Sequence, residues 1–368
     1  MKYIIGLFFC LNLIYSQEKK MLTNVELVQL NKNYQVEGQF IGGIQNDKPY
    51  WKGSKRELYD YRVSTKNELI NVLSIATKSN KSNVIYIPKD IEIDLTGEKG
   101  IVLSKGLTII GDRGIDGSAG AKIFTTESGV FPLFKAMDSV TIKGIRIEGG
   151  DKDMYYNNII FEGDNASKLN TYKNPVSSGI QVFGSNFVMI NCEMSGWTHT
   201  AVHIKENSEN NIFKYNYFHH NRRVGLGYGI TVDGGKALII ANLFDHNRHD
   251  IAGSGTIGSG YEVYLNVFLR NTYGDSVDMH GGKDRKDGTN ISGDYISIYN
   301  NYFEREVGGR KAVYIRGVPL KMSYIENNYV FVKKETDIKS NNKESLLQFK
   351  QVNQQGNLVI EENYITVE

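Results

Sequence analysis

The chain has 368 residues, and its 43 Lys and Arg residues against 41 Asp and Glu residues give a formal net charge of +2 at neutral pH. Proteins that bind nucleic acid need a strongly basic face, so this balance argues against a nucleic-acid partner. The 38 glycines and 23 tyrosines, beside only 5 prolines, are typical of a β-rich protein with many turns and not of a disordered chain.

Residues 1–16 have the pattern of a secretory signal peptide. Lys2 precedes an apolar run over residues 3–14, and Ser16 follows as the expected cleavage position. The run is shorter than the ~20 apolar residues of a transmembrane helix, and no later stretch approaches that length, so we expect no membrane span. We therefore expect a secreted or periplasmic protein. An outer-surface lipoprotein anchored through Cys10 is the less favoured alternative, because Cys10 lies within the apolar run.

A short helix is predicted before the main repeat. Residues 17–82 form an N-terminal extension, and 17–62 carry no clear pattern. Thr65 and Glu68 have the spacing of a capping box, and four apolar residues follow at helical spacing. These apolar residues are Leu69, Val72, Leu73 and Ala76. The pattern predicts an amphipathic helix over 65–78, after which the alternation typical of strands begins at residue 83.

From residue 83 onward the sequence repeats. An asparagine that precedes an apolar or aromatic residue recurs at intervals of mostly 24–27 residues, with two intervals of 35. These asparagines are Asn191, Asn216, Asn242, Asn266, Asn301, Asn328 and Asn363. A period of this length, built of short strands, predicts a stacked solenoid. Asparagines at equivalent bends can bond between neighbouring coils as a ladder.

This pattern resembles the right-handed parallel β-helix of the pectate-lyase-like superfamily, whose members usually carry an N-terminal capping helix. The resemblance implies an all-β fold, with one parallel β-helix domain over residues 83–368 and the helix at 65–78 as its cap. Capped solenoids are commonly monomeric, so we expect a monomer. The superfamily contains lyases, hydrolases, epimerases and phage adhesins, and the resemblance therefore specifies a fold and not a reaction.

A second strand register in the same coils predicts a polar outer face. Apolar residues alternate along these strands, so the residues between them point outward in two columns. One column contains Gln181, His203, Thr231, Ala252, Asp278, Tyr314 and Gln348. The neighbouring column contains Phe183, Lys205, Asp233, Ser254, His280, Arg316 and Lys350. Coils stack ~4.8 Å apart, which brings these groups within reach of a few sugar units.

The candidate site residues come from these columns and from the turns before them. All seven histidines of the chain lie between Gly196 and Gly282, which favours a functional surface in this region. The candidate catalytic residues are His203, His280, Tyr314, Asp233 and Asp278. The candidate substrate-binding residues are Lys205, Arg222, Arg223, Arg248, His249, Arg316, His199 and Trp197. A segment over 151–176 with several aromatic residues is expected either to wall a groove or to pack on the scaffold.

Three functions fit this face, and the first is favoured. A polysaccharide lyase acting on an acidic, uronate-containing glycan needs a base, an acid and a cation for the carboxylate. His203 or His280, Tyr314, and Lys205 with Arg316 supply these groups.

An inverting glycoside hydrolase would instead use Asp233 and Asp278. These residues lie two coils apart, roughly 9–10 Å by the coil spacing, against ~6.5–9.5 Å between the carboxyls of inverting enzymes. The third reading is a non-catalytic glycan-binding solenoid. The vicinal aspartates of polygalacturonases and the arginine signature of pectate lyases are not evident in the sequence.

No cofactor is firmly implied by the sequence. A compact metal motif such as H-E-x-x-H is absent. Calcium held by Asp233 or Asp278 is an alternative that would resemble some pectate lyases. The segment 253–258 fits the G-x-G-x-x-G pattern of nucleotide sites, but a strand pattern follows it where such sites need a helix.

Overall fold

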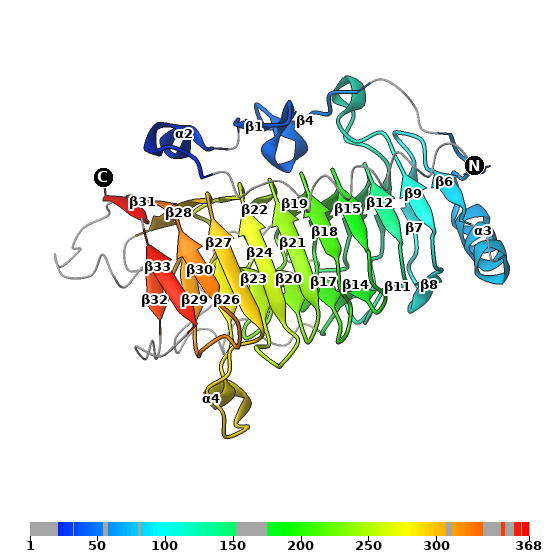
Figure 1. Ribbon diagram of the computed structural model, residues 1–368. Coiled ribbons are helices and arrows are strands. Elements are labelled where there is room, and N and C mark those ends of the chain that lie inside the picture. The colour runs from blue at the N-terminus through cyan, green and yellow to red at the C-terminus, as the bar shows by residue number, and fades with distance from the viewer. Residues whose placement is uncertain are drawn as a thin grey trace.

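The computed structural model describes residues 21–31, 33–53, 58–79, 82–151, 175–306, 311–333, 347–349, 357–361 and 363–367. Three long parallel sheets run side by side along one axis, and each complete coil contributes one strand to each sheet (Figure 1). This confirms the predicted parallel β-helix. The expected signal peptide at 1–16 and most of the aromatic segment at 151–176 lie outside the described residues.

The sheet that carries the two predicted outward columns is here called sheet I. Its described strands are β8 (Ile101–Leu103), β11 (Phe134–Ala136), β14 (Ser178–Val182), β17 (Thr200–Ile204), β20 (Tyr228–Val232), β23 (His249–Gly253), β26 (Val277–Met279), β29 (Val313–Ile315) and β32 (Leu347–Phe349).

Sheet II follows sheet I in each coil. Its described strands are β5 (Tyr61–Arg62), β6 (Val84–Tyr86), β9 (Thr108–Ile110), β12 (Thr141–Lys143), β15 (Val188–Ile190), β18 (Asn211–Lys214), β21 (Lys236–Ile240), β24 (Gly260–Tyr264), β27 (Tyr295–Tyr299), β30 (Ser323–Glu326) and β33 (Leu358–Glu361).

Sheet III closes the coil. Its described strands are β7 (Glu92–Asp94), β10 (Lys122–Phe124), β13 (Arg146–Glu148), β16 (Glu193–Ser195), β19 (Tyr217–His219), β22 (Leu243–Asp245), β25 (Val267–Phe268), β28 (Tyr302–Glu306), β31 (Tyr329–Lys333) and β34 (Tyr364–Val367).

Side chains of the same kind stack in the interior from coil to coil. Phe218, Phe244, Phe268 and Phe303 are fully buried, with successive ring centroids 5.3, 5.0 and 4.5 Å apart and nearly parallel planes. Parallel pairing in register places equivalent positions directly above one another, so a repeated aromatic residue becomes a continuous apolar column. This column fills the interior of the solenoid along sheet III.

The asparagine ladder is confirmed for six of its seven predicted members. Asn216, Asn242, Asn266, Asn301, Asn328 and Asn363 form a chain in which the side-chain oxygen of each later residue accepts from the main-chain and side-chain nitrogens of the one before.

The prediction was wrong for Asn191. Its side chain bonds to Arg113, and the ladder position of that coil belongs to Cys192, whose N–H donates to the side chain of Asn216. Asn191 instead occupies the preceding left-handed position, with φ 53°. Asparagine tolerates that conformation, so the same residue type suits both positions. Cys192 is a buried core residue, as its apolar surroundings suggested.

The predicted capping helix is α3 (Lys66–Lys78), and it lies at the end of the solenoid beside β6 and β8 (Figure 1). Its capping box is formed by Thr65 and Glu68 as the sequence indicated. The apolar stripe is buried against the first coils, so the helix covers hydrophobic residues that would otherwise meet water.

The extension that had no assignment lies along the outside of the solenoid. It contains α2 (Asn24–Gln29), β1 (Gln35–Val36), β2 (Gln39–Phe40), β3 (Ile44–Gln45) and β4 (Lys48–Pro49), which run over the coils back toward α3 (Figure 1). Leu27 and Ile41 belong to a second buried apolar cluster with the outward residues Leu238 and Leu243. The buried Arg113 guanidinium donates to the carbonyl of Gly42 and so fixes the extension to the coils. None of the described helices is long and apolar enough to cross a membrane.

Candidate functional site

The strand register confirms the two predicted columns in the coils from His203 to Arg316. His203 pairs with Thr231, Thr231 with Ala252, Ala252 with Asp278, and Asp278 with Tyr314. The second column follows directly after the strands. Its members Lys205, Asp233, Ser254, His280 and Arg316 each donate a main-chain N–H to the preceding coil. Lys350, the last predicted member, lies outside the described residues.

One group of polar residues, here called the Asp233 cluster, comprises His199, His203, Lys205 and Asp233. Oδ2 of Asp233 lies 3.7 Å from Nε2 of His203 and 3.5 Å from Nζ of Lys205. The side chain of Asp233 is 42% exposed. Hydrogen bonding from His203, Ser254 and the nearby Lys205 charge hold the pKa of Asp233 well below its usual range, so it is ionised at any working pH.

His199 completes this cluster as a neutral imidazole. Its ring centroid lies 5.6 Å from that of His203, and the edges of Phe131 and Tyr228 pack nearby. Burial, together with the neighbouring His203 and cations, lowers the pKa of His199 to about 4. A ring that stays uncharged at neutral pH can accept a proton but carries none to donate as a cation.

The second group, here called the Asp278 cluster, comprises Asp278, His280, Tyr314 and Arg316. Oδ2 of Asp278 lies 2.5 Å from Nη2 of Arg316 and 3.4 Å from Nε2 of His280. Arg316 also lies over the Tyr314 ring at 4.6 Å, and Lys311 approaches the same ring at 4.7 Å. Carboxylate, imidazole, guanidinium and phenol are therefore joined in one group on adjacent coils.

Asp278 is ionised although its side chain is fully buried. Burial by itself would raise the pKa of its carboxyl, but the hydrogen bond to His280 and the charges of His249 and Arg316 hold that pKa below the usual value. The same pairing raises the pKa of Arg316 against the opposing effect of its own burial. Asp278 thus orients His280 and Arg316 and does not itself reach the surface.

Behind this cluster lies a layer that includes His249, Asp275 and Arg248. His249 stacks on Tyr228, with centroids 5.5 Å apart and planes at 12°, and its Nδ1 lies 2.7 Å from the main-chain oxygen of Asp275. One possible ligand atom each of His249, Asp275 and Asp278 lies within 4.8 Å of the others. Among the described residues this is the group of His, Cys, Asp and Glu side chains with the spacing of a metal site.

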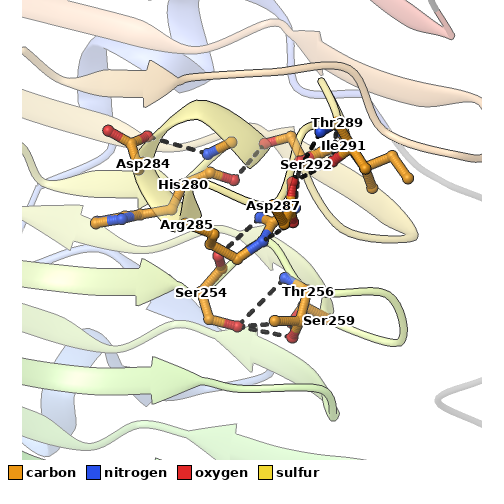
Figure 2. A network of polar contacts seen from close by, with 11 residues as sticks. Ser254, Thr256, Ser259, His280, Asp284, Arg285, Asp287, Thr289, Ile291 and Ser292 are labelled. Atoms are coloured by element: carbon orange, nitrogen blue, oxygen red, sulfur yellow. Dashed lines mark hydrogen bonds and ion pairs between the residues drawn. The ribbon is translucent and has the colours of Figure 1, made fainter.

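Between the two clusters the face is lined by small side chains, and a loop closes one side of it. Ala252, Gly253 and Ser254 form the floor that the sequence predicted. The loop after His280 contains α4 (Gly282–Arg285), which projects from the solenoid in Figure 1. Figure 2 shows Arg285 reaching from this loop to Ser254, where its Nη1 donates to the carbonyl oxygen at 3.0 Å. The loop is therefore fixed beside the floor.

Three predicted substrate-binding residues are buried, and we do not carry them forward as substrate contacts. Trp197 is fully enclosed in the apolar core. Arg222 is 2% exposed, and its guanidinium donates to the hydroxyl of Tyr273. His249 is 4% exposed beneath Tyr228. Arg223 and Arg248 are partly exposed at the edge of the face.

The remaining histidines gather away from this face. His219, His220 and His246 lie at the ends of sheet III strands, with Nδ1 of His219 and His220 2.7 Å apart and the rings of His220 and His246 stacked at 4.3 Å. The clustering of all seven histidines in the sequence therefore divides into two places in the structure. Lys311 and Asp284, both close to the Asp278 cluster, were missed because turns and a loop bring them there and strand alternation does not indicate them.

A pocket lies at another place, between the N-terminal extension and sheet II. Trp51, Tyr86, Asp112 and Arg113 line it. The Tyr86 hydroxyl donates to Asp112 and Arg113 binds the extension, so these polar groups hold the scaffold together. The candidate functional site is therefore the outer face of sheet I, where the Asp233 and Asp278 clusters lie.

Comparison with known proteins supports the fold. No known protein-family profile matches the chain, and no curated protein matches it. Among solved structures, DFA-IIIase from Arthrobacter chlorophenolicus A6 in complex with GF2 is similar over 84% of this chain and 77% of that one, with 15% identity and a TM-score of 0.54.

Two further solved structures have lower TM-scores. They are endo-xylogalacturonan hydrolase from Aspergillus tubingensis (12% identity, 81% and 89% coverage, TM-score 0.47) and alginate lyase from Paenibacillus sp. str. FPU-7 (14% identity, 83% and 98% coverage, TM-score 0.43). The similarity to DFA-IIIase agrees with the parallel β-helix fold that the three sheets show. At these identities the likeness shows the fold alone.

Proposed function

We propose that this protein is a carbohydrate-active enzyme that cleaves a uronate-containing polysaccharide by β-elimination on the open face of sheet I. The similarity of its fold to DFA-IIIase is compatible with a carbohydrate substrate. The predicted signal peptide supports export of the enzyme, which would then act outside the cytoplasm as a secreted or periplasmic protein.

The protonation state of Asp233 and Asp278 is the observation that favours elimination over hydrolysis. An inverting hydrolase needs one carboxylic acid with a raised pKa to protonate the leaving oxygen. Basic partners hold the pKa of both Asp233 and Asp278 below the usual value. Burial raises the pKa of Asp250 to about 7, but that side chain is fully enclosed and cannot reach a substrate. Asp233 and Asp278 are therefore ionised and cannot donate the proton that the leaving oxygen needs in hydrolysis.

The Asp278 cluster supplies the groups that elimination requires. A base removes the proton next to the uronate carboxylate, the bond from the neighbouring carbon to the leaving oxygen breaks, and an acid protonates that oxygen as a double bond forms. We assign His280 as the base and Tyr314 as the acid. Arg316, assisted by Lys311, provides positive charge for the uronate carboxylate, whose negative charge grows in the transition state.

The Asp233 cluster would bind the adjacent sugar units. Lys205 offers an ammonium group, and the neutral His199 and partly exposed His203 offer hydrogen-bonding groups beside it. In this proposal a sugar ring would lie over the small side chains of Ala252 and Ser254, between the two clusters.

The experiment is an incubation of the mature protein with a panel of acidic and neutral polysaccharides. The expected result is ultraviolet absorbance of unsaturated uronate ends, lost in His280→Ala and Tyr314→Phe. Tyr324→Phe, an exposed tyrosine on sheet II, is the matched control and should keep the wild-type rate. New reducing ends without that absorbance would instead establish hydrolysis, and binding without either signal would leave a glycan-binding protein.

A further inference from the structure

We propose that His249, Asp275 and Asp278 form a binding site for a divalent transition-metal ion, with Zn²⁺ as the best fit. The site lies beneath the Asp278 cluster, and it does not depend on the reaction proposed above. One ligand atom from each residue lies within 4.8 Å of the other two. Zinc ligands lie ~2.0–2.2 Å from the ion, so side-chain shifts of about 1 Å or less would bring the three atoms to bonding distance.

The three residues come from neighbouring coils of a rigid sheet. His249 begins β23, Asp275 lies in the turn before β26, and Asp278 is the central residue of β26. The two strands pair in parallel register from Ile251 onward. A site whose ligands are held on paired strands is already close to its bound geometry, which lowers the cost of ordering them around an ion.

The carboxylate of Asp278 gives the second, independent indication of a ligand. Oδ2 is held by Arg316 and His280, whereas the buried Oδ1 has no hydrogen-bond partner within the described part of the chain. A buried polar atom without a partner destabilises the fold, and more so when it is charged. A cation at Oδ1 would remove that cost. Outer hydrogen bonds of the kind that Oδ2 makes are usual for metal-binding carboxylates.

His249 is held in the tautomer that a metal ligand needs. The main-chain carbonyl of Asp275 can only accept, so Nδ1 of His249 must carry the proton of the 2.7 Å bond between them. A neutral imidazole then keeps its lone pair on Nε2. Stacking on Tyr228 fixes the plane of the ring. A bond from one ring nitrogen to a backbone carbonyl is the usual arrangement behind a metal-binding histidine.

The ligand set and the local charge select the kind of ion. One imidazole nitrogen with two carboxylates suits Zn²⁺ or a similar transition metal, whereas Ca²⁺ takes six to eight oxygen ligands. The Arg316 guanidinium pairs with Asp278, and the main-chain N–H of Lys311 donates to Oδ1 of Asp275. Two carboxylates beside one guanidinium favour a divalent cation over a monovalent one. Calcium at Asp233 is not favoured, because His203 and Lys205 already engage that carboxylate.

The test measures binding directly on the full mature chain after treatment with a chelator. Calorimetric titration should show about one Zn²⁺ per chain and much weaker binding of Ca²⁺. His249→Gln and Asp275→Asn should each weaken Zn²⁺ binding at least tenfold, since each removes one of three ligands. His246→Gln and Asp284→Asn are matched controls outside the site and should bind as wild type does. Circular dichroism checks that every variant is folded.

A second measurement keeps the proposal testable if the ligand variants do not fold. X-ray absorption of the Zn²⁺-loaded wild-type protein should show one imidazole and otherwise oxygen ligands. Two or more imidazoles would place the ion at another group of histidines, such as His219, His220 and His246 or His199 and His203, and overturn the proposal. Absence of Zn²⁺ binding by the folded wild-type chain, or wild-type affinity in His249→Gln, would also overturn it. Elimination activity plays no part in these readings, so the metal site and the proposed reaction can fail separately.

Discussion

Two aspartate–histidine pairs lie on the same face of sheet I and differ mainly in burial. In the Asp233 cluster the carboxylate is 42% exposed and lies 3.7 Å from its histidine. In the Asp278 cluster the carboxylate is fully buried and lies 3.4 Å from its histidine, beneath Arg316. The two pairs also differ in register. His203 and Asp233 come from adjacent coils, with Asp233 just after its strand, whereas Asp278 lies within β26 and His280 follows it two residues later in the same coil.

This difference separates two roles for one pair of residue types. An exposed ion pair is screened by water and contributes little to stability or to orientation. A buried pair is held in one geometry and leaves an uncompensated charge when either partner is removed. We therefore assign substrate binding to the Asp233 cluster and chemistry to the Asp278 cluster, and the following experiments test that division from the largest expected effect to the smallest.

Removing the two histidines should give unequal losses of activity. His280→Ala should lower kcat by about 10²–10⁴, the usual contribution of a general base, whereas His203→Ala should lower it by less than about tenfold. Steady-state kinetics on an acidic polysaccharide measure both. If the larger loss falls on His203, the chemical centre belongs to the Asp233 cluster.

Removing the two carboxylates should give unequal losses of stability. Asp278→Ala should lower the free energy of unfolding by about 3 kcal/mol or more, because Arg316 and His280 lose a buried partner. Asp233→Ala should lower it by less than about 1 kcal/mol, because water already solvates that pair. Urea denaturation at neutral pH measures both values. Equal losses would contradict the argument from burial.

The dependence of stability on pH tests a property that His199 and His249 share. Burial lowers the pKa of each to about 4, whereas an unfolded histidine has a pKa of ~6.5. Between about pH 6.5 and 4 the folded state binds fewer protons than the unfolded state, so stability falls as the pH is lowered through this window. His199→Gln should reduce this fall by about 1–3 kcal/mol.

The control for that measurement takes account of Asp250. Burial raises the pKa of Asp250 to about 7, so its contribution opposes that of the histidines and destabilises the fold as the pH rises from about 4 to 7. Comparison of the variant with wild type at each pH cancels this contribution. Denaturation curves of both proteins at pH values across the window provide the measurement, and an unchanged slope in His199→Gln would show that its imidazole titrates normally.

The smallest expected effect concerns binding. Lys205→Gln should raise KM for an acidic polysaccharide about two- to fivefold with little change in kcat, since an exposed charge contributes up to about 1 kcal/mol. The effect should shrink as salt is added. Lys236→Gln, on sheet II, is the matched control and should leave KM unchanged. A large fall in kcat for Lys205→Gln would instead place this residue in the chemical step.

Much of the face was predictable because a solenoid converts sequence period into spatial proximity. The columns through His203, Asp278 and Tyr314 followed from alternation alone, including the coil at Ala252 where the pattern is weakest. The turns were less predictable. Trp197 lies in a turn before a strand, as the partly exposed Arg223 and Arg248 do. Its large apolar ring is nevertheless buried in the core, where it is more stable than in water.

The sequence by itself determined the parallel β-helix, its capping helix and the outward columns, since local periodicity and parallel stacking suffice to specify them. Only the tertiary structure decided that Asn191 yields its ladder position to Cys192, that the extension covers an outer apolar face, and that Asp278 is buried while Asp233 is not. Burial depends on what neighbouring coils and distant segments place over a residue. Local sequence patterns do not indicate which segments will cover a residue. For this reason the different burial of Asp233 and Asp278 could be seen only in the tertiary structure.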